Sequence, residues 1–253
     1  MSELEAILYV GHGTRAKDGK EQVIRFINEV KQKVAAPVQE ISFIELTEPS
    51  IEAGIDACVR KKATKITIVP LLLFSGGHAK RDIPLAIERA KVRFPHVQFT
   101  CGRPFGSDAR FITILVDLLQ EQGFSQDIRE RSRASILLVG RGSSEINVLL
   151  EMTKITERLR QVLRTDSVEV CYLASAKPSF ESSLENVLSS SQRKVFILPY
   201  LLFTGVLIKR MQKTVAMLQT DKQISLCRYL GSDKRLIDVV ADYVEEARSY
   251  VFV

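Results

Sequence analysis

Tryptophan is absent from this chain of 253 residues, and only 7% of its residues are aromatic. Proteins that bind single-stranded nucleic acid stack the bases on aromatic side chains and gather their cations in one patch. Here the lysines and arginines are dispersed along the sequence. The composition therefore indicates no nucleic-acid partner, although the net charge of +6 favours an anionic partner such as a small polycarboxylate.

Cysteine is scarce, and the four cysteines form no CxxC pair: they stand at Cys58, Cys101, Cys171 and Cys227. In a chain of this length, such scatter is typical of reduced thiols in a cytosolic protein. It speaks against a disulfide framework, a zinc ribbon and a cysteine-bound cluster.

Long hydrophobic runs and targeting signals are missing too. No stretch approaches the roughly 20 apolar residues that a membrane-spanning helix requires. The first residues, MSELEAILYVGHG, carry no basic segment ahead of a long apolar one, so we expect neither a signal peptide nor a membrane anchor. These absences predict a cytoplasmic protein without a membrane partner.

Nucleotide-binding motifs are also absent. The glycine-rich stretch GHGTRAKDG, residues 11–19, lacks the GK[ST] ending of a phosphate-binding loop, and no GxGxxG follows a predicted strand. We therefore expect neither ATP nor a dinucleotide as cofactor.

What the chain does contain is one pattern written twice. ILYVGHGT at residues 7–14 matches ILLVGRGS at residues 136–143, an offset of 129 residues. The same offset aligns Lys80-Arg81 with Lys209-Arg210. Two copies of one fold, made by internal duplication, are the simplest account.

Each copy alternates short apolar runs with stretches whose apolar residues recur every three to four positions. In the first copy the strand-like runs lie near residues 6–11, 39–46, 65–74 and 97–101, and the helical patterns near 20–34, 49–62, 83–94 and 109–123. Together with the repeat, such alternation predicts an α/β protein of two similar lobes, residues 1–122 and 134–253, each a parallel sheet flanked by helices. Pro70 and its counterpart Pro199 lie inside strand patterns, so we expect a bulge or a local break there.

Three polar positions of the first copy change character in the second: His12 corresponds to Arg141, Glu45 to Ala174 and His78 to Leu207. Each lies at the end of a predicted parallel strand, where ligands bind in open α/β sheets. Two imidazoles and a carboxylate suit a divalent ion such as Fe²⁺, Co²⁺, Ni²⁺ or Zn²⁺. The spacing is no metal signature in itself, and the alternative is that His12 is a turn residue and His78 an ordinary loop histidine.

The residues around these histidines have structural alternatives as well. Gly11 and Gly13 flank His12, and Gly76 and Gly77 precede His78. These glycines serve either tight turns or the close approach of backbone to a flat ligand. Asp82 either orients His78 or caps the helix that follows, and we expect the cap. His96 stands in a predicted turn and is expected to be an ordinary surface residue.

Three motifs carry a family resemblance: LYVGHGTR, SFIELTEPSIEAGI and VPLLLFSGGHAKRDIP. In this order they resemble the class II tetrapyrrole chelatases of the CbiX/SirB type, and the second half of the chain fits the degenerate repeat of the long, two-domain form. The resemblance implies ATP-independent insertion of a divalent metal into sirohydrochlorin, with release of two protons and no tightly bound cofactor. It favours Fe²⁺ and sirohaem as product, because the histidine-rich segment and the cluster-binding cysteines of some cobalt-inserting members are absent.

The resemblance also implies roles for residues. His12 and His78 correspond to catalytic, metal-binding histidines, with Glu45 as the acidic neighbour that orients a histidine, binds the ion or relays protons. The resemblance also implies a cleft between the two lobes. The first lobe would then carry the chemistry, and the second lobe would line this substrate cleft. For the polycarboxylate substrate we expect contacts from Gly76, Gly77, Lys80, Arg141, Lys209 and Arg210. The alternative for these cations is a solvated helix N-terminus.

Two other functions stay open. One is insertion of Co²⁺ into the same macrocycle, since a purified protein of this kind is expected to accept both metals. The other is a carrier of metal or tetrapyrrole that performs no turnover. Because the duplication places two lobes in one chain, we expect a monomer with a complete cleft.

Overall fold

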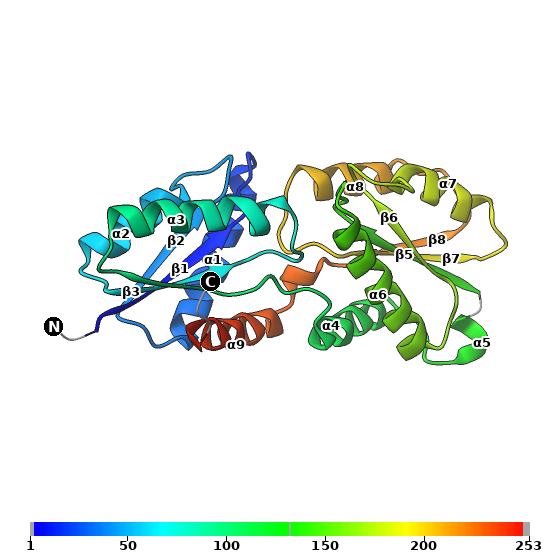
Figure 1. Ribbon diagram of the computed structural model, residues 1–253. Coiled ribbons are helices and arrows are strands. Elements are labelled where there is room, and N and C mark those ends of the chain that lie inside the picture. The colour runs from blue at the N-terminus through cyan, green and yellow to red at the C-terminus, as the bar shows by residue number, and fades with distance from the viewer. Residues whose placement is uncertain (1–2, 132, 250–253) are drawn as a thin grey trace. The chain divides into compact units, whose positions relative to one another are not determined.

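Two four-stranded parallel sheets form the cores of the protein, as the alternating pattern predicts (Figure 1). The computed structural model describes residues 3–131 and 133–249, apart from the side chain of His78. Within these residues, no helix is long and apolar enough to cross a membrane.

The first sheet has the order β2-β1-β3-β4, and all neighbouring strands run parallel. Its strands are β1 (Glu5–Gly11), β2 (Val38–Phe43), β3 (Lys65–Pro70) and β4 (Gln98–Cys101). The central strand β1 is fully buried from Ala6 to Val10 because helices cover both faces of the sheet. On one face lies α1 (Lys17–Lys33), and on the other lie α2 (Ile51–Arg60) and α3 (Ile83–Arg93).

The second sheet repeats this arrangement in the order β6-β5-β7-β8. Its elements are β5 (Ala134–Gly140), α6 (Ile146–Leu163), β6 (Val168–Tyr172), α7 (Phe180–Ser189), β7 (Lys194–Pro199), α8 (Val206–Ala216) and β8 (Gln223–Leu226). A short helix, α5 (Ile128–Arg131), lies in the stretch that joins the two copies. The predicted duplication of a parallel α/β fold is therefore confirmed.

The two strand prolines terminate their strands. Pro70 is the last residue of β3 and pairs with Val10, and Pro199 ends β7 in the same way. Leu71 then donates its backbone N–H to the Val10 carbonyl at 2.9 Å. Of the two expectations, a bulge or a local break, the strand shows the break, because the run predicted for residues 65–74 ends at Pro70. The proline takes the final ladder position, so its missing N–H interrupts no pairing within the strand.

The last helix of each copy packs on the other sheet. α4 (Ala109–Glu121) contacts α6 and β7, and α9 (Arg235–Ser249) contacts α1, β3 and β4 (Figure 1). The described residues up to Gly106 and those from Lys234 onward thus form a first unit, and Ser107–Asp233 form a second. These units differ from the predicted lobes, residues 1–122 and 134–253, because α4 belongs to the second unit and α9 to the first.

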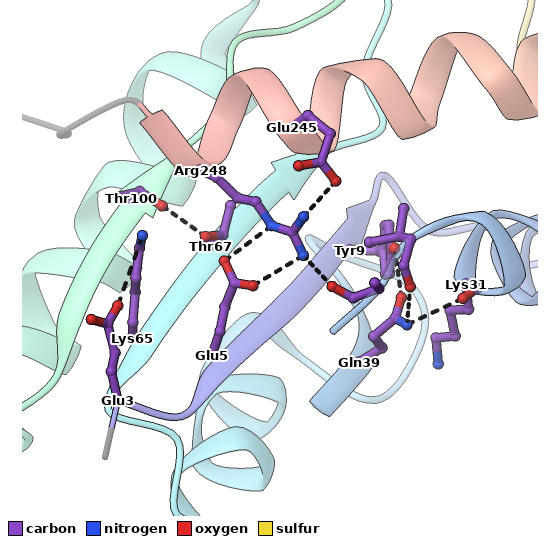
Figure 2. Close-up of polar contacts among 12 residues, drawn as sticks. Glu3, Glu5, Tyr9, Lys31, Gln39, Lys65, Thr67, Thr100, Glu245 and Arg248 are labelled. Atoms are coloured by element: carbon purple, nitrogen blue, oxygen red, sulfur yellow. Dashed lines mark hydrogen bonds and ion pairs between the residues drawn. The ribbon is translucent and has the colours of Figure 1, made fainter. Parts of the chain in front are cut away.

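Polar side chains anchor α9 to the first unit. Figure 2 shows the Arg248 guanidinium between the carboxylates of Glu5 and Glu245, with its Nη2 lying 3.0 Å from Glu5 Oε2. Nη2 also donates to the Ala35 carbonyl at 2.6 Å. Farther along α9, the Tyr243 hydroxyl donates to the Phe105 carbonyl at 2.9 Å, and the two rings meet edge to face. A helix that arrives from the far end of the sequence is therefore part of the first core.

Candidate active site at the carboxyl edge of the first sheet

His12 and Glu45 lie side by side where β1 and β2 end. The pairing of these strands continues into the loops: Ile44 donates its N–H to the Gly11 carbonyl at 3.0 Å, and Glu45 donates to the His12 carbonyl at 3.1 Å. His12 Nδ1 consequently lies 3.6 Å from Glu45 Oε1. The His12 side chain is 27% exposed and that of Glu45 42%, whereas the Nε2 atom of His12 is itself buried.

Gly13 permits this close approach of the two loops. Its φ of +97° is left-handed, and a Cβ at this position would lie 1.8 Å from the Glu45 carbonyl oxygen. Gly142 repeats the geometry in the second unit, with φ of +95° and a Cβ position 1.7 Å from the Ala174 carbonyl oxygen. The loop therefore has the same backbone conformation in both copies, and each copy requires a glycine at this position.

The segment that carries His78 differs from its counterpart. In the first unit a short π-helix, η1 (His78–Asp82), leads into α3, whereas the second unit has a regular α-helix from Val206 onward. Single π-turns occur frequently at functional sites. The side chain of His78 lies outside what the structure describes, so its distance from His12 and Glu45 stays a prediction.

Asp82 does not cap the following helix, and that prediction was wrong. Its backbone is already helical, because η1 runs into α3 without a break, and its side chain makes no capping bond. Instead Asp82 Oδ1 accepts a hydrogen bond from Arg81 Nε at 2.9 Å.

The predicted substrate contacts come from both units. Lys80, Arg141, Lys209 and Arg210 are exposed, and Gly76 and Gly77 are half-buried. Gly76 accepts hydrogen bonds through its carbonyl from the N–H groups of Ala79 and Lys80, so it shapes the start of η1. Arg210 Nη2 lies 2.7 Å from Glu181 Oε1, and its charge is already partly compensated.

The environments of the four cysteines disfavour metal binding. All four are free and buried, and burial raises the pKa of each thiol to about 12. A metal-binding cysteine is a thiolate, which these environments disfavour. Among the described side chains, a set that omits His78, no three His, Cys, Asp or Glu residues gather closely enough to hold a metal.

Two further residues complete the comparison with the sequence. His96 lies exposed in the turn between α3 and β4, which confirms its prediction as a surface residue. Thr47 was not singled out by the motifs, yet its hydroxyl bonds the loop that follows His12. The repeat alignment carried the signal, because the residue opposite Thr47 is Ala176.

Comparison with known proteins shows the family to which this sequence belongs. The CbiX family model matches residues 6–122 and 135–247, which together cover both copies of the repeat. The chain belongs to the CbiX family.

Relatives within the CbiX family include enzymes named for two metals. The chain is 39% identical to a sirohydrochlorin ferrochelatase of Priestia megaterium, over 96% of this chain and 90% of that protein. It is 35% identical to a sirohydrochlorin cobaltochelatase of the same organism, over 96% of this chain and 80% of the other. The solved structure of SirB from Bacillus subtilis with Fe³⁺ superposes with a TM-score of 0.86 at 34% identity, covering 97% of this chain and 96% of that one.

Proposed function

We propose that this CbiX-family protein is a sirohydrochlorin ferrochelatase, which inserts Fe²⁺ into sirohydrochlorin without ATP. The observation that carries the proposal is the His12–Glu45 pair, which stands at the sheet edge of one copy and is replaced by Arg141 and Ala174 in the other. Similarity to a ferrochelatase along 96% of the chain supports the choice of substrate. In the reaction the ring loses two N–H protons and gains one M²⁺ ion, so charge balances without a nucleotide.

His12, His78 and Glu45 would handle the metal and the protons. A neutral imidazole binds a divalent ion, and with a pKa near neutrality it also accepts a proton. Glu45 faces Nδ1 of His12, the position from which a carboxylate fixes the orientation and tautomer of a metal-binding imidazole. We assign the metal to Nε2 of His12, the buried nitrogen of the ring, with His78 as the second ligand.

The second unit would hold the macrocycle. Arg141 replaces His12 there, and Lys209 and Arg210 follow the loop after β7. Val206 is 65% exposed where the first copy has Gly77. An apolar side chain beside cations suits a ligand with an apolar ring and a carboxylate rim. Gly76, Gly77 and Lys80 would contribute from the first unit.

Insertion of Co²⁺ is the second candidate function, because the chain is also 35% identical to a cobaltochelatase. The two metals are compared by kcat/KM for Fe²⁺ and Co²⁺ on the same preparation, and the larger value identifies the favoured substrate.

The deciding experiment is an anaerobic absorbance assay with excess sirohydrochlorin, Fe²⁺ or Co²⁺, and no nucleotide. The native chain is compared with His12→Ala and His78→Ala, and spontaneous insertion is subtracted. His96→Ala is the matched control, because it removes the third histidine of the chain from an exposed turn. We expect many turnovers per chain in the native protein and His96→Ala, and a loss of about 100-fold or more in the other two variants.

The outcomes separate the candidates. A native rate equal to the blank, with one ring metallated per chain at most, contradicts a chelatase and supports a carrier. Full activity in His12→Ala and His78→Ala keeps the chelatase and removes these residues from its mechanism.

A further inference from the structure

The hydroxyl of Thr47 joins the two loops that carry His12 and Glu45. Thr47 Oγ1 accepts a hydrogen bond from the Thr14 N–H at 2.9 Å and donates one to the Thr14 carbonyl, also at 2.9 Å. Thr14 stands two residues after His12, and Thr47 stands two residues after Glu45. One side chain thus continues the pairing of β1 and β2 beyond the point where backbone pairing ends.

The second copy builds the same loops without this hydroxyl. Ala174 donates its N–H to the Arg141 carbonyl at 2.9 Å, as Glu45 does to His12. The turn that follows is left-handed in both copies, with φ of 61° at Leu46 and 54° at Ser175. The residue opposite Thr47 is Ala176, which has no polar side-chain atom. The loop backbone therefore does not depend on the threonine.

A second bond shows the same asymmetry. Lys20 Nζ donates to the Glu48 carbonyl at 3.1 Å and ties the loop after β2 to α1. The counterpart of Lys20 is Leu149, whose side chain cannot donate a hydrogen bond. The two side chains that make these bonds in the first copy, those of Thr47 and Lys20, are thus replaced in the second copy by Ala176 and Leu149, whose side chains form no hydrogen bonds.

We propose that Thr47 is a positioning residue for metal insertion, which holds the His12 loop against the Glu45 loop through the Thr14 backbone. The inference rests on the proposed function, because it assigns Thr47 to the same site. At 3.6 Å, His12 Nδ1 and Glu45 Oε1 lie just beyond hydrogen-bond distance, so a small relative shift of the two loops decides whether they bond. A displacement of about 1 Å at a catalytic group lowers rates by as much as about 100-fold.

Three variants test the assignment. Thr47→Val removes the hydroxyl and keeps a branched side chain of similar size, and Thr47→Ser restores the hydroxyl. Thr64→Val is the matched control, because Thr64 Oγ1 accepts from the Leu4 N–H at 2.9 Å before β1 and β3 begin, at the opposite edge of the same sheet. It deletes a comparable loop bond and leaves the His12 loop untouched.

Two measurements are made on each variant. Steady-state metallation with Fe²⁺ yields kcat and the KM for sirohydrochlorin. Proton–carbon NMR of the histidine rings follows His12 directly, since the chain has three histidines and His12→Ala assigns its signal. The NMR measurement needs no substrate.

We expect Thr47→Val to lower kcat about tenfold with KM within about twofold, and to shift the His12 ring signal. Thr47→Ser is expected to recover most of both, and Thr64→Val to leave both at native values. Native kcat and an unshifted His12 signal in Thr47→Val overturn the proposal, as do equal losses in Thr47→Val and Thr64→Val.

Failure of the proposed function is distinguishable from failure of this inference. If the native chain shows no turnover, the chelatase reading fails, while the NMR comparison still decides whether Thr47 positions His12. If the native chain turns over and the Thr47→Val signal and rate are unchanged, the positioning role alone is lost.

Discussion

Individual side chains at the sheet edges are constrained from several directions. Gly13 cannot carry a Cβ because the Glu45 carbonyl occupies that space, and Glu45 in turn accompanies His12. Gly142 meets the same limit beside the Ala174 carbonyl, although Arg141 and Ala174 replace the histidine and the glutamate in that copy. Glycine at this turn is thus a requirement of the loop, and the histidine and glutamate are additions to it.

The buried thiols lead to a prediction on pH. Burial raises the pKa of Cys58, Cys101, Cys171 and Cys227 to about 12, whereas the thiol of an unfolded chain has a pKa of about 8.5. Above about pH 8.5 the unfolded chain loses protons that the folded chain keeps. The thiol contribution to the free energy of unfolding is therefore complete below that pH and falls as the pH rises towards 12.

Thiol labelling and denaturation check this prediction. At about pH 8, Ellman's reagent is expected to react slowly with the native chain, whose thiols are buried. In concentrated guanidinium it is expected to react with all four thiols. The urea midpoint is expected to fall between about pH 8 and pH 10, and to fall less in Cys58→Ala, which has one thiol fewer. Rapid reaction of one thiol per native chain would contradict the burial of that residue.

Among the elements, α2 and α7 start in the same way. Ser50 Oγ accepts a hydrogen bond from the Ala53 N–H, and Ser179 Oγ accepts from Ser182, each at 3.2 Å. In both units this cap follows the loop after the second strand, so it fixes where that loop meets the helix. The loop of the first unit carries Glu45 and Thr47.

Removing the N-terminal cap of α2 is expected to lower the free energy of unfolding. Ser50→Ala should decrease the free energy of unfolding by about 1 kcal/mol, and Ser50→Asp should preserve it, because aspartate caps as well as serine. Urea denaturation followed by circular dichroism measures both. An equal loss in the two variants would mean that the serine acts through something other than the cap.

At the scale of the whole molecule, the exchange of α4 and α9 makes each unit depend on both halves of the chain. The chain passes between the units twice, at Gly106–Ser107 and at Asp233–Lys234. α9 buries seven side chains in the first unit: Leu236, Ile237, Val239, Val240, Tyr243, Val244 and Ala247. At about 1.5–3 kcal/mol for each large apolar side chain, this burial rivals the roughly 5–15 kcal/mol that stabilises a typical domain.

Deleting the chain after Asp233 is therefore expected to unfold the first unit. The shortened protein keeps His12, Glu45 and His78, yet it should lose metallation and hydrogen-exchange protection in β1–β4, while β5–β8 stay protected. Lys33→Ala in the full chain is the control, because it removes only the exposed pair with Asp238, worth at most about 1 kcal/mol. Protected β1–β4 strands without α9 would show that the helix is an accessory.

The sequence alone determined the parts of this protein that follow from local pattern and from repetition. The period of the apolar residues predicted the four strands and four helices of the first copy within a few residues, because burial on one face leaves that period in the sequence. The parallel topology then placed His12 and Glu45 at one edge, and the structure brings them within 3.6 Å. The difference between the two copies of the sequence predicts both residues as members of the site.

Only the tertiary structure decided which partners these elements meet. An amphipathic pattern shows that α4 and α9 each bury one face, but it does not specify which sheet covers that face. The bond between Thr47 and Thr14 spans 33 residues of sequence and depends on two loops meeting in space. The sequence around Asp82 is typical of a helix N-cap, but Asp82 makes no capping bond because the helical backbone begins before it, in η1. Local pattern encodes elements and their buried faces, whereas contacts between distant segments arise when the chain packs.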